Sequence, residues 1–128
     1  MHPPKISSIT PVLAVDTIEA VLPFWDALGF EAVVKVPAEG PLDFVILKTG
    51  ESEVMYQTHK SLAEDLPTAT PGTTLLYVQV GDLDAAEAAT QGARRLFERR
   101  KTFYGALEFG VEDPAGHVVV FSHFATQQ

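Results

Sequence analysis

The sequence contains no cysteine among its 128 residues. A chain without cysteine forms no disulfide, offers no thiolate to a metal and has no cysteine nucleophile. It also lacks any apolar run near the ~18 residues that a membrane-spanning helix needs, and its first fifteen residues lack the apolar core of a secretory signal. The sequence therefore predicts a cytoplasmic protein without a membrane partner.

Positive charge is scarce, with 9 Lys and Arg against 17 Asp and Glu and a net charge of −8. This acidic excess disfavours nucleic-acid binding and favours cationic or neutral partners. Five basic residues nevertheless lie close together. This basic segment is either an anion-facing patch or a charged edge strand, since charges blunt exposed sheet edges. It contains Arg94, Arg95, Arg99, Arg100 and Lys101.

Several common motifs are missing, namely GxGxxG, the Walker loop, GxSxG, HExxH and the EF-hand loop. Nucleotide binding, serine hydrolysis, zinc proteolysis and calcium binding therefore lack their sequence signatures. Hydrophobic residues make up 46% and charged residues 20% of the chain, which is ordinary globular composition. We expect one domain over residues 1–128.

One pattern of elements occurs twice. Residues 9–15 predict a strand, Asp16 and Thr17 offer caps, and a helix with a kink at Pro23 is expected to follow until Gly29. The same pattern is found sixty-five positions later, with a predicted strand over 75–80, Asp82 as a cap and a helix that ends before Gly92. Three further strands are expected after each helix. Their ranges are 31–36, 44–48 and 53–58, then 93–99, 106–112 and 117–124.

Each half is therefore a βαβββ module, and we predict an α+β fold. Its two modules form a curved mixed sheet around a cavity, with the helices on the outer face. Module one covers about residues 6–58 and module two about residues 73–124. The linker between them, about residues 59–72, favours a short helix over 61–66 before Pro67.

Strand geometry assigns side chains to faces. Successive strand residues point to opposite sides, so one set packs under the helix and the other lines the hollow. In the first strand Ile9, Leu13 and Val15 are expected to pack under the helix. The set expected to line the hollow in the first and fifth strands is Thr10, Val12, Ala14, Leu75, Tyr77 and Gln79.

Two local signatures accompany the repeat. FWDALGF at residues 24–30 closes the first helix, and VEDPAGH at residues 111–117 precedes the last strand. Together with the repeat, they resemble the vicinal oxygen chelate superfamily, which includes glyoxalase I, extradiol dioxygenases, fosfomycin-modifying enzymes and bleomycin-resistance proteins. The resemblance runs from about Ile6 to Phe124 and implies the fold, whereas activity has to be argued from the site.

Metal-dependent members of that superfamily place a His, Gln or Glu ligand in each of four strands. The resemblance puts these positions on Thr10, Met55, Leu75 and Val120. A hydroxyl, a thioether and two aliphatic groups do not replace the donors that divalent ions need. The adjacent positions supply no carboxylate or imidazole, being Ile9, Pro11, Val54, Tyr56, Thr74, Leu76, Val119 and Phe121. We expect no metal and no other cofactor.

Glu108 is the candidate catalytic residue. If its neighbours Leu107 and Phe109 pack under the helix, its carboxylate enters the hollow, where burial would raise its pKa and make it a proton acceptor. Alternatively it is a solvated or salt-bridged residue paired with Arg94 or Arg99. A further interpretation pairs it with His123 as acid and base. The other histidines, including His117, are expected at the surface.

Aromatic side chains are candidates for stacking a planar ligand. They are Phe44, Tyr56, Tyr77, Phe103 and Tyr104. The residues predicted to bind a ligand are Thr10, Val12, Met55, Gln57, Leu75, Tyr77, Gln79, Tyr104, Glu108 and Val120.

These residues lead to three hypotheses. The first is a metal-independent protein that sequesters a small cationic or planar organic molecule, as the bleomycin-resistance branch of the resembled superfamily does. The second is a metal-independent lyase or isomerase that uses Glu108 with Tyr77 or Tyr104. The third is a structural or interaction module, which predicts a filled cavity. The resemblance also implies a homodimer in which paired modules complete two cavities.

Overall fold

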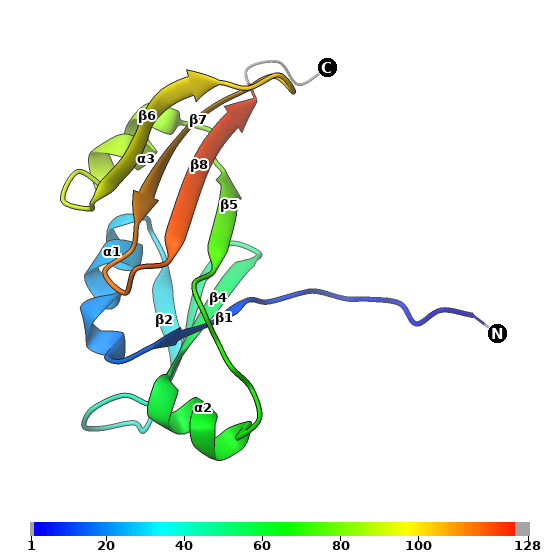
Figure 1. The fold of residues 1–128 in the computed structure, drawn as a ribbon, viewed down its shortest axis with the longest axis vertical. Coiled ribbons are helices and arrows are strands. Elements are labelled where there is room, and N and C mark those ends of the chain that lie inside the picture. Colours follow the sequence, from blue (N-terminus) through cyan, green and yellow to red (C-terminus); the bar gives the residue numbers. More distant parts are fainter. Residues whose placement is uncertain (1, 125–128) are drawn as a thin grey trace.

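The computed structural model describes residues 2–124 and contains two successive βαβββ modules (Figure 1). The expected repeat is therefore confirmed. Module one contains β1 (Val12–Val15), a 3₁₀ helix η1 (Ile18–Ala20), α1 (Leu22–Ala27), β2 (Glu31–Val36), β3 (Phe44–Thr49) and β4 (Ser52–Thr58). The connecting helix is α2 (His59–Asp65). Module two contains β5 (Leu75–Gln79), α3 (Leu83–Ala89), β6 (Arg95–Lys101), β7 (Ala106–Glu112) and β8 (Val118–Phe124).

Each module forms its own four-stranded mixed sheet. The strand orders are β1-β4-β3-β2 and β5-β8-β7-β6, so the two sheets have the same topology. In each sheet the first and last strands pair in parallel and the remaining neighbours pair antiparallel. Figure 1 shows the modules one above the other. The α+β fold is confirmed, and within residues 2–124 the two sheets remain separate and do not close.

The first helical stretch differs from the single kinked helix expected from the sequence. It is divided into η1 and α1, and Pro23 lies in the first turn of α1. Proline has no backbone N–H and suits the first helical turn, where that donor has no intrahelical partner. Pro23 therefore begins a second helix. Thr17 makes no side-chain cap, whereas Asp82 caps α3 by accepting from the N–H of Ala85 at 3.1 Å.

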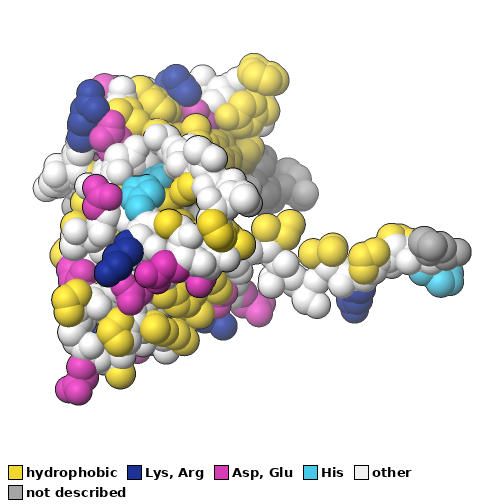
Figure 2. All heavy atoms as spheres, turned by 60° about the horizontal axis from the view of Figure 1, so that its bottom comes forward, with side chains coloured by type: hydrophobic (Ala, Val, Ile, Leu, Met, Phe, Trp, Pro, Cys, Tyr) yellow, Lys and Arg dark blue, Asp and Glu magenta, His cyan; other side chains and the backbone are white. Residues whose placement is uncertain are grey.

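Residues 2–11 form an extended segment before β1. Figures 1 and 2 show this N-terminal arm standing away from the body, with hydrophobic side chains along it. Ile6 is 67% exposed and Ile9 is 88% exposed. The expectation that Ile9 packs under the first helix is wrong, because β1 begins only at Val12.

The core lies on the helix-facing side of both sheets. Alternation along the strands places Leu13 and Val15 of β1 and Phe109 and Val111 of β7 in one cluster with Trp25. One hydrophobic core therefore runs through both modules. No helix among residues 2–124 has the length and apolar character needed to span a bilayer.

A buried polar network also joins the modules. The indole N–H of Trp25 donates to the hydroxyl of Tyr56 at 2.7 Å, and that hydroxyl donates to the carboxylate of Asp113. Burial, and then the Asp113 charge, raise the pKa of Tyr56 well above its usual value. Tyr56 therefore remains a protonated donor, and its complete burial contradicts its expected role in stacking a ligand.

His117 belongs to the same junction. Its Nδ1 lies 3.0 Å from the N–H of Thr74, and its Nε2 lies 2.8 Å from the carbonyl of Ala14 in module one. An N–H only donates and a carbonyl only accepts, so the neutral Nε2–H tautomer fits both contacts. The expected surface position of His117 is wrong, because Asp113 accepts from its backbone N–H at 2.8 Å and holds it at the buried end of the turn.

Candidate functional site

A hydrogen-bonded carboxylate occupies the sheet face of module two that points away from the helices, which we call the second hollow face. One oxygen of Glu108 accepts from the hydroxyls of Tyr77 at 3.0 Å and Tyr104 at 2.9 Å. The other accepts from Nη2 of Arg100 at 3.1 Å and from Nε at 3.3 Å. The Glu108 side chain is 4% exposed and that of Arg100 is 58% exposed. The structure thus joins three of the predicted ligand-binding residues.

The strands explain why these side chains meet. Arg100 of β6 lies directly opposite Glu108 of β7 in the antiparallel pairing. Tyr77 lies on β5 and reaches Glu108 across β8, which separates β5 from β7. Tyr104 lies in the turn between β6 and β7, four residues before Glu108. Four segments of module two therefore contribute to the site.

The surroundings of Glu108 lower its pKa. Burial acts to raise the pKa, but hydrogen bonds from Tyr104, Tyr77 and Arg100 outweigh it and hold the pKa below its ordinary value. The expected rise of the Glu108 pKa is therefore wrong, because three donors stabilise the ionised carboxylate. Hydrogen bonds with Tyr77 and Glu108 raise the pKa of Tyr104 to about 12, so this phenol remains a donor.

The expected partners of Glu108 were also wrong in detail. The salt bridge forms with Arg100 instead of Arg94 or Arg99, because irregularities in β6 shift its register against β7. His123 does not pair with Glu108. Its Nδ1 lies 3.0 Å from the carbonyl of Val80.

The other arginines of the basic segment are paired elsewhere. β6 is an edge strand of its sheet, and acidic side chains of α3 and of β7 accept from these arginines. The segment is therefore a salt-bridged sheet edge, and Arg94, Arg95 and Arg99 do not form a free anion-facing patch. The pairs are Arg94–Glu112, Arg95–Glu87, Arg99–Asp84 and Arg99–Glu87.

Aromatic surface adjoins Glu108. The guanidinium carbon of Arg100 lies 3.8 Å from the centre of the Phe97 ring. That ring occupies the space above Gly110, where a Cβ would collide with its Cε2 atom. Phe103 and Tyr104 are exposed at the adjacent turn. Neither Phe97 nor the role of Arg100 was predictable from local sequence patterns, because only the strand register places Arg100 opposite Glu108.

The remaining predicted ligand-binding residues fall into two groups on different sheets. Leu75, Gln79 and Val120 share module two with Glu108, and Tyr77 pairs directly with Val120. Those of module one lie on or just before β1 and β4. They are Thr10, Val12, Met55 and Gln57.

Two of the module-one residues are already engaged within the chain. The amide N–H₂ of Gln57 donates to Ser61 at 2.9 Å and to Asp65 at 2.8 Å, both on α2. Thr10 donates to Glu53 at 3.2 Å. Val12 and Met55 are neighbours in the parallel pairing of β1 and β4. The structure thus assembles the site in module two and leaves the module-one residues on their own sheet.

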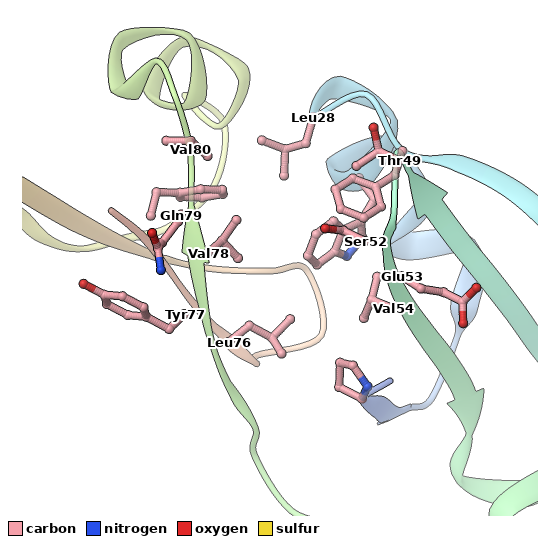
Figure 3. Close-up of a pocket in the computed structure, with 14 residues that line it drawn as sticks. Leu28, Thr49, Ser52, Glu53, Val54, Leu76, Tyr77, Val78, Gln79 and Val80 are labelled. Atoms are coloured by element: carbon pink, nitrogen blue, oxygen red, sulfur yellow. The ribbon is translucent and has the colours of Figure 1, made fainter. Parts of the chain in front are cut away.

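A separate crevice of about 310 Å³ opens between the modules. In Figure 3, Leu76 and Val78 of β5 point into it, whereas Tyr77 and Gln79 point to the other side of the strand. The crevice is therefore a gap beside the core, on the opposite face of β5 from Glu108. Its remaining apolar lining includes Trp25, Leu28, Phe30, Val54, Val80 and Phe121.

The side chains present do not fit a divalent metal. The positions expected to bind one hold Thr10, Met55, Leu75 and Val120, whose groups cannot replace carboxylate and imidazole donors. Over residues 2–124, no cluster of three or more His, Asp or Glu side chains could hold a metal ion. Metal independence itself remains a prediction.

Comparisons with known proteins agree with the fold. TioX from Micromonospora sp. ML1 has a TM-score of 0.78 and 23% identity over 92% of this chain and 98% of that one. A lactoylglutathione lyase from Agrobacterium tumefaciens has a TM-score of 0.71 and 20% identity over 95% of this chain and 96% of that one. The bleomycin resistance determinant encoded on transposon Tn5 has a TM-score of 0.70 and 16% identity over 94% of this chain and 100% of that one. At these identities the likeness shows the fold alone.

No curated protein matches the sequence. The family model described as Glyoxalase/Bleomycin resistance protein/Dioxygenase superfamily matches residues 5–121, which is nearly the whole chain. Together with the repeated βαβββ topology, this match shows that the chain belongs to the glyoxalase/bleomycin resistance protein/dioxygenase superfamily.

Proposed function

We propose that this protein binds and sequesters a planar organic molecule on the second hollow face, without a metal. The observation that carries the proposal is the exposed aromatic surface around the fixed Glu108 carboxylate. Tyr77 and Tyr104 are exposed there, and the Phe97 ring stacks on Arg100, the ion-pair partner of Glu108. Flat aromatic side chains with a few fixed polar groups are typical of sites for planar ligands.

The pairing of Glu108 favours a planar ligand over one recognised by its positive charge. A cationic group would have to compete with Arg100 for a carboxylate that already accepts four hydrogen bonds. Breaking a buried ion pair leaves an uncompensated charge, which is costly. The acidic net charge therefore does not provide a free carboxylate at this site.

The same contacts favour binding over acid–base catalysis. A general base works best with a pKa near the working pH and with access to the substrate proton. The pKa of Glu108 is instead held low, and both carboxylate oxygens already accept from Tyr77, Tyr104 and Arg100. An interaction module would fill its hollow, whereas Leu75 and Tyr77 are exposed here.

A homodimer is part of the proposal. A second copy would place its own module-one face, with Val12 and Met55, over the second hollow face and thereby complete two cavities. Val12 and Leu75 are exposed apolar side chains within one chain, as are Ile6 and Ile9 of the arm. A cytoplasmic location remains a prediction from the sequence.

Isothermal titration with uncharged two-ring and three-ring aromatic compounds tests the proposal. We expect saturable binding that weakens about threefold to tenfold in Tyr104→Ala and Phe97→Ala, as expected for loss of an aromatic contact. The control Leu66→Ala removes an exposed apolar side chain beyond α2 and should bind normally. The absence of saturable binding across the panel, or full affinity in both aromatic variants, would contradict the proposal.

A further inference from the structure

We propose that the planar ligand carries a carboxylate, which binds the guanidinium of Arg100. This inference rests on the proposed binding of a planar molecule to the second hollow face, and it reverses the cationic preference expected from the net charge. The observation behind it is that Arg100 is held in place by two neighbours while part of its donor set stays exposed.

Glu108 holds one edge of the guanidinium. Both Nε and Nη2 of Arg100 donate to the same carboxylate oxygen, at 3.3 and 3.1 Å. An arginine has five N–H donors in a rigid planar group. Within residues 2–124, Nη1 of Arg100 makes no hydrogen bond, and the side chain is exposed. The two N–H groups of Nη1 therefore have no acceptor among these residues and are available to a ligand.

Phe97 holds the flat face of the same group. The stacking distance of 3.8 Å between guanidinium carbon and ring centre restricts rotation of the Arg100 side chain. Gly110 provides the space in which Phe97 lies, since any Cβ there would collide with the ring. An arginine fixed in this way loses little conformational freedom when it binds a carboxylate, so more of the interaction energy contributes to affinity.

The other arginines of the basic segment do not share this arrangement. Arg95 and Arg99 donate to acidic residues of α3, and Arg94 donates to Glu112. Arg100 instead pairs with a buried carboxylate whose charge is also stabilised by two phenol donors. Glu108 therefore acts as a positioning residue for Arg100.

Aromatic side chains close to Arg100 define the rest of the ligand. Tyr104 is exposed and donates to Glu108, and the exposed ring of Phe103 packs edge-on against Tyr104, so a ligand ring can lie against them while its carboxylate reaches Nη1. The net charge of −8 opposes an approaching anion. This repulsion is screened beyond about 8 Å at physiological salt, whereas the contact with Arg100 acts at hydrogen-bond distance.

Three probes with the same ring system test the inference: 2-naphthoate, 2-naphthamide and 2-naphthylmethylammonium. Titrated into the full chain at pH 7.5 and physiological salt, naphthoate is expected to bind at least about tenfold more tightly than naphthamide, as one charge-assisted contact predicts. Arg100→Gln should reduce this ratio to about one. Arg100→Lys, which keeps the charge without the planar fork, should retain an intermediate ratio.

Arg94→Gln is the matched control, since it removes an arginine of the same strand region that pairs with Glu112, and it should keep the naphthoate preference. Equal affinity for naphthoate and naphthamide, tighter binding of the ammonium probe, or an unchanged ratio in Arg100→Gln would overturn the inference while leaving planar binding intact. Failure of all three probes to bind would overturn both proposals.

Discussion

Glu108 shows how a single buried carboxylate can remain ionised. Removing a carboxylate from water is costly, and the cost is offset only where hydrogen bonds and an opposite charge replace the lost hydration. Tyr77, Tyr104 and Arg100 supply these contacts. The result is a fixed acceptor that orients three donors, each from a different segment of module two.

The low pKa of Glu108 predicts a contribution to stability that depends on pH. The pKa of Glu108 is near 4.5 in the unfolded chain and lower in the folded one. The stabilising contribution is therefore fully present above the unfolded pKa and is lost as the pH falls through the folded pKa. We expect Glu108→Gln to be less stable at pH 7 and to lose less free energy of unfolding between pH 5 and pH 3. Urea denaturation at each pH measures both effects.

Glu112→Gln is a suitable control on the same strand, because Glu112 pairs with the exposed Arg94. In this variant the free energy of unfolding should fall between pH 5 and pH 3 by the full amount attributed to Glu108. An identical loss of stability on acidification in Glu108→Gln and in the unsubstituted protein would show that Glu108 does not contribute.

At the scale of elements, the junction between Tyr56 and Asp113 connects α1 and β4 of module one with the turn between β7 and β8. Its polar groups are buried, and each has a hydrogen-bond partner. A satisfied network of this kind positions the elements relative to each other, whereas a partly satisfied one is destabilising. The junction therefore complements the shared apolar core, which has no directional preference.

Tyr56→Phe should destabilise the protein by about 1–3 kcal/mol, because it leaves Trp25 without an acceptor and Asp113 without one donor in a buried site. Urea denaturation at neutral pH gives this free energy. Tyr104→Phe serves as the comparison, since it removes one donor of a half-exposed side chain from a carboxylate that keeps other donors, and it should cost less. A Tyr56→Phe variant as stable as the unsubstituted protein would refute the assigned role of the junction.

For the whole molecule, the separation of the two hollow faces is the main consequence of the fold. Each sheet covers one side with core residues and leaves its other side open, and the modules are joined through their helix-facing side. Exposed apolar side chains lie on these faces and on the N-terminal arm, among them Leu75, Val12 and Ile9. In the proposed dimer a symmetric partner covers them.

Multi-angle light scattering should accordingly give about twice the chain mass of 13.9 kDa. The double variant Ile6→Ser with Ile9→Ser removes exposed apolar side chains of the arm and should shift the protein toward monomer on dilution. Leu66→Ser changes another exposed apolar side chain, away from the arm, and should remain dimeric. A monomer mass for the unsubstituted protein at about 100 μM would contradict the proposed dimer.

Local patterns in the sequence were sufficient to predict the repeated βαβββ order, the short α2 and the division of strand residues between two faces. These features depend on alternation, turn residues and caps, which act within a few positions of the chain. The same alternation placed Tyr77 on the hollow side, and it placed Glu108 there on the condition that Leu107 and Phe109 pack into the core, as they do. The residue types at the superfamily's metal-binding positions are also a property of the sequence alone.

Other features depended on the tertiary structure. The register of β6 against β7 determined that Arg100, with Phe97 beside it, meets Glu108, and the contact between modules buried His117 and Tyr56. Strand irregularities and the packing of one module on another are set by the balance of many contacts distant in sequence. The sequence by itself therefore determined the repeated fold, whereas only the tertiary structure decided that Arg100 is the arginine paired with Glu108.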